Sequence, residues 1–191
     1  MMKSAFTIAA VSVCAQAEQL PQAIPSTAAV LNLSDGGPTP KYAAEVIGVY
    51  FAELSYLNRL SGIDSCVLDG KATVSAVMNV FDDIKLGKEI KAIEDGIVAA
   101  MTVKSALHEC VSEAPQDIMA LASWLMRTSS SKQALVDAAS ANTHLHSQEI
   151  MKQTQGVWDV FFAFNDPVGT GKALARTSYW ALGPVNANAT I

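Results

Sequence analysis

The stretch that decides the fold is residues 64–110, DSCVLDGKATVSAVMNVFDDIKLGKEIKAIEDGIVAAMTVKSALHEC. Gly87 divides it into two halves of similar length, and each half carries apolar residues at the three-and-four spacing of one helix face. These residues are Val67, Val74, Val77, Met78, Phe81 and Ile84 before Gly87, and Ile90, Ile93, Ile97, Met101 and Leu107 after it. A glycine at such a junction ends a helix and permits a tight turn. The stretch therefore predicts two antiparallel helices that fold back on each other at Gly87.

Two cysteines stand at the outer ends of this predicted hairpin. Cys66 and Cys110 lie at similar distances from Gly87, so an antiparallel hairpin would bring both to the same open end. In an oxidising secretory route such a pair forms a disulfide, and a bridge closing a loop of this length contributes about 4 kcal/mol, less any strain. We therefore expect a disulfide between Cys66 and Cys110. Two buried free cysteines are the alternative.

Helical patterns also lie on both sides of the hairpin. Thr39 is a suitable N-cap for a helix with Pro40 at its first position and an apolar stripe that continues to Gly62. Three further helical patterns follow the hairpin, over residues 117–127, 132–164 and 170–182. The sequence predicts an all-α protein, a bundle of about six helices built from helical hairpins with one disulfide.

The second half of the chain leaves two alternatives open. The Ser/Thr run 128–131 is expected to break one helix and cap the next, which fits either one long helix or two with a weak point near Gly156. Residues 157–164 are rich in aromatic and branched side chains, so a short strand competes with the helix there.

The first 17 residues have the three parts of a signal peptide. Lys3 precedes an apolar run that contains Cys14, and the run closes on Ala15-Gln16-Ala17, a small-x-small cleavage pattern. A buried first helix is the alternative. We expect cleavage before Glu18, followed by an irregular lead-in over 18–38, a helical domain over 39–184 and a polar tail over 185–191. The sequence thus predicts a secreted protein.

Composition and charge restrict the class of protein. Half of the 191 residues are apolar and 16% are charged, a balance typical of a folded domain. The net charge is -5 and the lysines and arginines are scattered, whereas nucleic-acid binding needs a clustered basic face. No segment reaches the roughly 20 apolar residues of a membrane span. We expect neither nucleic acid nor a membrane span among the interactions of this protein.

The hairpin carries a resemblance to a known group of proteins. The stretches Ile63-Asp64-Ser65-Cys66, Phe81-Asp82-Asp83-Ile84-Lys85-Leu86-Gly87 and His108-Glu109-Cys110 together resemble the cysteine-bracketed helical hairpin of small secreted proteins of ciliates and similar protists. The later Phe164-Asn165-Asp166 with Leu182-Gly183 is similar to their C-terminal hairpin. The resemblance implies a helical fold and a secreted location, and it implies no particular activity.

The sequence contains no complete set of catalytic or metal-binding residues. His144 and His146 would lie on different sides of a helix, and His146 with Glu149 supplies only two ligands. The run Val168–Lys172 lacks the spacing of a phosphate loop and is better explained as a glycine-permitted turn into the last helix. Adjacent carboxylates at 82–83 and 94–95 are accounted for by solvation and helix dipoles. We expect no enzyme activity, no metal and no cofactor.

Two further sets of residues are candidates for contact with other molecules. Trp158, Phe161 and Phe162 belong to a segment that is apolar around its whole circumference, which is typical of a central core helix and alternatively of an apolar ligand pocket or contact surface. Asn32 and Asn188 begin N-glycosylation sequons, which apply in a eukaryotic source. We expect a secreted, non-enzymatic helical protein that acts by extracellular binding or protein interaction. The alternative is an extracellular carrier of a small apolar ligand within the bundle.

Overall fold

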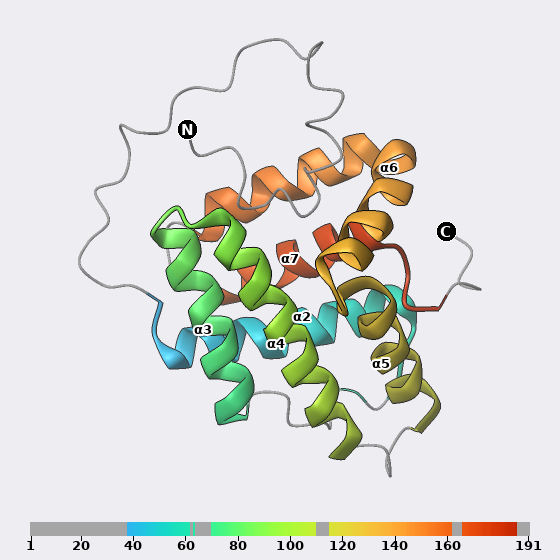
Figure 1. The fold of residues 1–191 in the computed structure, drawn as a ribbon, viewed down its shortest axis with the longest axis horizontal. Helices are drawn as coiled ribbons and strands as arrows, with labels where there is room; N and C mark the ends of the chain where they lie inside the picture. The colour runs from blue at the N-terminus through green and yellow to red at the C-terminus, as the bar shows by residue number, and fades with distance from the viewer. Residues whose placement is uncertain (1–37, 62, 64–69, 110–114, 162–165, 187–191) are drawn as a thin grey trace.

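The computed structural model describes residues 38–61, 63, 70–109, 115–161 and 166–186 (Figure 1). These residues form six helices and no strand, which confirms the predicted all-α class for this part of the chain. The helices are α2 (Pro40–Asn58), α3 (Lys71–Lys85), α4 (Glu89–Glu109), α5 (Pro115–Ser129), α6 (Lys132–Phe161) and α7 (Pro167–Leu182).

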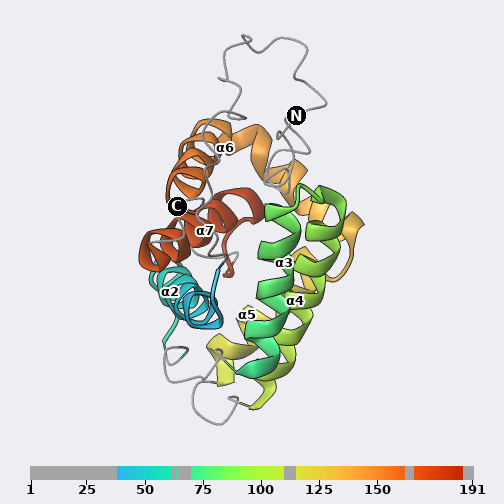
Figure 2. The ribbon, with the colours of Figure 1, turned by 90° about the vertical axis from the view of Figure 1, so that its left-hand side faces the viewer.

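Four of the described helices pack as two pairs, α3 with α4 and α2 with α7. Figure 2 shows α3 and α4 side by side on one flank of the molecule, with α2 and α7 on the other. The most extensive contacts join α6 to α7, α2 to α7 and α3 to α4. Helices α2 and α7 run in the same direction, because Tyr42 bonds Thr170 at one end and Glu53 bonds Arg176 further along. The first and last described helices therefore form a parallel pair.

Helix α2 begins as the sequence predicts and ends earlier. The Thr39 hydroxyl oxygen accepts a hydrogen bond from the backbone N–H of Tyr42 at 3.1 Å, and Pro40 occupies the first turn. The helix stops at Asn58 because Arg59 adopts a left-handed conformation with φ 54°. The backbone N–H of Arg59 then donates to the carbonyl of Tyr56, so the helix ends before Gly62.

The turn of the predicted hairpin is confirmed. Gly87 has φ +67°, a conformation that favours glycine, and it separates α3 from α4. The backbone N–H of Lys88 bonds the carbonyl of Asp83 at 2.8 Å and closes the turn. Helix α3 begins at Lys71 with Gly70 as its N-cap, which is later than the start near Cys66 that the sequence predicts. Val67 and the two cysteines lie outside the described residues.

The break between α5 and α6 is shorter than expected. Thr128 and Ser129 belong to α5, because the Thr128 hydroxyl donates to the carbonyl of Trp124 at 2.8 Å and so fits a helical position. Only Ser130 and Ser131 interrupt the two helices, and the Ser131 hydroxyl oxygen accepts from the N–H of Ala134 to cap α6.

Helices α6 and α7 differ from the expected boundaries in two further ways. The irregular point of α6 lies at His146, with φ -125° and ψ 29°, and Gly156 is helical. Helix α7 begins at Pro167 rather than Thr170, because the Asp166 carboxylate accepts from the N–H of Gly169 at 2.7 Å and caps it. The segment explained as a glycine-permitted turn therefore forms the first turns of this helix.

The main core lies where α2, α4, α5 and α7 meet. Its fully buried side chains include Leu54, Leu107, Ile118, Leu121 and Trp124. The indole N–H of Trp124 donates to the carbonyl of Gly183 at 3.0 Å, and the N–H of Val185 donates to the Asn58 side chain at 2.7 Å. Val185, which the sequence analysis places in the polar tail, is thus part of this core.

Candidate functional site

Most of the candidates chosen from sequence lie outside the described residues. This is so for Cys66 and Cys110, for Asn32 and Asn188, and for Phe162. Trp158 and Phe161 lie in the last turns of α6, but their side chains are not among those described. The disulfide, the sequons and the ligand pocket therefore remain predictions.

The histidines of α6 do not belong to a group of three potential metal ligands in the described part of the chain. The described residues contain no group of three or more histidine, cysteine, aspartate or glutamate side chains placed to hold a metal ion. The His146 ring instead contacts the Trp180 ring of α7, with centroids 5.0 Å apart. His146 therefore helps to pack α6 against α7.

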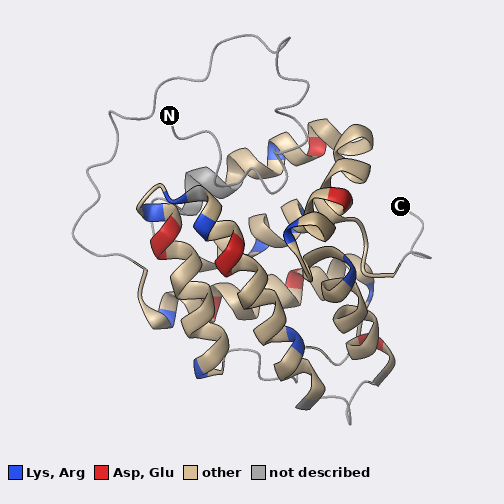
Figure 3. Cartoon of the chain, in the orientation of Figure 1, with Lys and Arg blue, Asp and Glu red and all other residues tan. Residues whose placement is uncertain are grey.

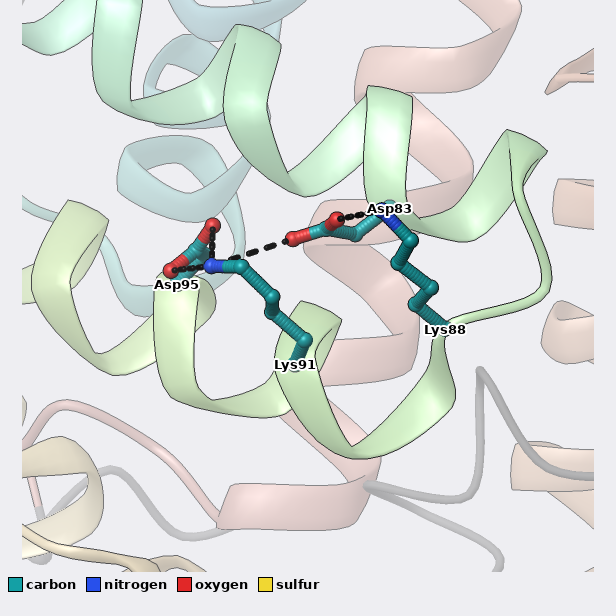
Figure 4. Close-up of polar contacts among 4 residues, drawn as sticks. All are labelled: Asp83, Lys88, Lys91 and Asp95. Carbon is teal, nitrogen blue, oxygen red and sulfur yellow. Dashed lines mark hydrogen bonds and ion pairs between the residues drawn. The ribbon is translucent and has the colours of Figure 1, made fainter.

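A polar cluster joins α3 to α4 near their turn. Figure 4 shows it as four side chains: Asp83, Lys88, Lys91 and Asp95. The Lys91 ammonium lies 3.1 Å from both carboxylate oxygens of Asp95 and 3.7 Å from Oδ2 of Asp83, while the Lys88 ammonium lies 4.0 Å from the other Asp83 oxygen. Figure 3 shows that the acidic positions of α3 and α4 lie toward the turn end of the two helices, with basic positions near them. Lys91 is thus shared by two carboxylates, one from each helix.

Lys91 and Asp95 each favour the charged form of the other. The hydrogen bond to Asp95 raises the pKa of Lys91 above its ordinary value. The same bond lowers the pKa of Asp95 below its ordinary value. The two shifts have opposite directions, as expected for a lysine and a carboxylate that form a charge-assisted hydrogen bond.

The explanation of Asp83 as a solvated carboxylate is wrong, because the residue is buried. Its side chain is 8% exposed, and Oδ2 accepts no hydrogen bond among the described residues. The sequence spacing indicates this burial, because Asp83 lies seven positions after the buried Ala76 and so falls on the same face of α3. A buried carboxylate is stable only beside a positive charge, and here Lys88 and Lys91 provide it.

Exposed apolar side chains lie beside the polar cluster. Leu86, the C-cap of α3, is 63% exposed and Ile90, in the first turn of α4, is 65% exposed. A surface hollow of about 450 Å³ adjoins the turn, and its lining residues are Gly87, Lys88, Ile90, Lys91 and Glu94. We call Leu86 together with these five residues the hairpin-tip surface. It combines two large exposed aliphatic side chains with an open, shallow depression whose lining includes three charged residues.

Other large apolar side chains are exposed singly. Met119 on α5, Leu145 and Met151 on α6, and Val98 on α4 are each more than half exposed. Scattered exposure of this kind is normal on soluble proteins and marks no site. The hairpin-tip surface differs because Leu86 and Ile90 stand on either side of one turn and Ile90 lines the hollow.

The described helices include none that is both long enough and apolar enough to cross a membrane. Comparisons of the chain with protein-family models, with curated proteins and with solved structures found no match. Its function must therefore be argued from its own residues.

Proposed function

We propose that this chain is a secreted, non-enzymatic helical protein that acts outside the cell by binding another protein through its hairpin-tip surface. The observation that carries the proposal is the exposure of Leu86 and Ile90 on either side of the Gly87 turn. Burying a side chain of this size in an interface contributes about 1.5–3 kcal/mol. Two of them supply a hydrophobic anchor for a partner.

The polar cluster shares Lys88 and Lys91 with the hairpin-tip surface. Asp95 bonds Lys91 at 3.1 Å and Asp83 lies 3.7 Å from the same ammonium, so Lys91 is held in place in the free protein. A surface whose side chains are ordered in the free protein loses less conformational entropy on binding.

Secretion and the disulfide belong to the same proposal. Support comes from the Ala15-Gln16-Ala17 pattern, from the resemblance to small secreted proteins of ciliates and similar protists, and from the described hairpin. Helix α4 ends at Glu109, immediately before Cys110, and Cys66 lies five positions before the start of α3. A Cys66–Cys110 bridge would close the end of the hairpin opposite the binding surface.

The binding proposal is tested with the double variant Leu86→Gln/Ile90→Gln. Immobilised mature protein is exposed to culture medium of the source cells, the retained protein is purified, and its affinity is then measured. We expect at least about tenfold weaker binding by the double variant, since each 1.4 kcal/mol of lost contact is a factor of ten. The matched control is Met119→Gln, which changes an equally exposed apolar residue on α5 and should bind as the unsubstituted protein does.

Two outcomes would contradict the proposal. One is a partner that binds the double variant and the unsubstituted protein equally, which would place the interface elsewhere. The other is intact protein retained inside the cell with Met1 still present, which would remove the extracellular setting. For the disulfide, mass analysis of the unreduced mature protein should find no free thiol.

A further inference from the structure

We draw no further inference here: the strongest candidate, the surface hollow beside the α3–α4 turn with exposed Ile90 in its lining, belongs to the binding surface already described, and nothing in the structure shows what chemistry of partner covers it.

Discussion

The hydroxyl of Tyr42 on α2 lies 2.8 Å from the Oγ1 atom of Thr170 on α7, and both residues are buried. This contact joins positions 128 residues apart at the matching ends of two parallel helices. Hydrogen bonds between buried hydroxyls are costly to break singly, because the remaining partner is left without water. The pair therefore helps to fix how α7 lies along α2.

Replacing Thr170 with valine tests the contribution of this contact. Thr170→Val keeps the shape of the side chain but removes its hydrogen bond to Tyr42, so we expect a loss of about 0.5–1.5 kcal/mol in the free energy of unfolding. Tyr42→Phe should cost a similar amount. The double variant should lose less than the sum of the two, as measured by denaturant unfolding. Strict additivity would show that the two hydroxyls do not interact.

The close approach of α7 to α2 at Gly171 predicts that a larger residue there destabilises the protein. A Cβ at Gly171 would lie 2.8 Å from the carbonyl oxygen of Val46 and 2.8 Å from Cβ of Val49, and neither atom can move without the α2 backbone. We expect Gly171→Ala to destabilise the protein by about 1–3 kcal/mol.

The matched control for that substitution lies on the partner helix. At Gly48 of α2 an added Cβ would meet nothing within 4 Å, so Gly48→Ala should gain about 0.5–1 kcal/mol from helix propensity alone. Thermal unfolding of both variants measures the difference. A Gly171→Ala protein as stable as the unsubstituted one would show that α2 and α7 do not pack this closely.

Local signals account for what the sequence predicted correctly. Thr39 as a cap and Gly87 as a turn act within four residues of their partners, and the helical spacing of apolar residues is likewise a local pattern. The parallel packing of α2 against α7 depends on pairs such as Tyr42 and Thr170, which no local pattern reveals. Gly171 shows the difference, since its sequence context suggested a turn whereas its role is to let two helices approach.

The candidate site was only partly predictable for the same reason. The sequence located the turn at Gly87, yet the exposure of Leu86 and Ile90 depends on which faces of α3 and α4 the other helices cover. Asp83 was explained as a solvated carboxylate because its burial follows from the packing of α3 and not from its neighbours in the chain. Tertiary contacts decide both cases.

The Lys91–Asp95 pair predicts a pH dependence with a defined sign. The pKa of Asp95 is lower in the folded protein than in the unfolded chain, where an aspartate titrates near about 3.9. The stabilisation is therefore present above that value and is lost as the pH falls through the lower pKa of the folded state. Asp95→Asn should remove the part of the free energy of unfolding that this pair contributes and that is lost in acid. Unfolding curves recorded between about pH 5 and pH 2 would measure it.

Salt provides the control for this electrostatic effect. Both side chains are solvent-accessible, so high ionic strength should weaken their attraction and reduce the difference between Asp95→Asn and the unsubstituted protein. Asp137→Asn changes an exposed aspartate of α6 whose carboxylate accepts a bond from the uncharged Gln133, and it should alter the acid profile less. Identical acid profiles for the Asp95→Asn and unsubstituted proteins would rule out a contribution from this pair.

The aromatic end of α6 separates the core explanation from the ligand-carrier alternative. If Phe161 fills the core, as we expect, Phe161→Ala should reduce the free energy of unfolding by about 3–5 kcal/mol, because truncation removes buried area and leaves a cavity. Met151→Ala is the control on the same helix, since Met151 is 55% exposed and its truncation should change stability by about 0.5 kcal/mol or less.

Fatty acids, sterols and hydrophobic dyes should leave the melting temperature of the mature protein unchanged. The contrary result is a ligand that raises the melting temperature with increasing concentration and alters the tryptophan fluorescence, with the shift abolished in a folded Phe161→Ala variant. In that case the residues would line a ligand cavity, and the carrier function would replace the one proposed above.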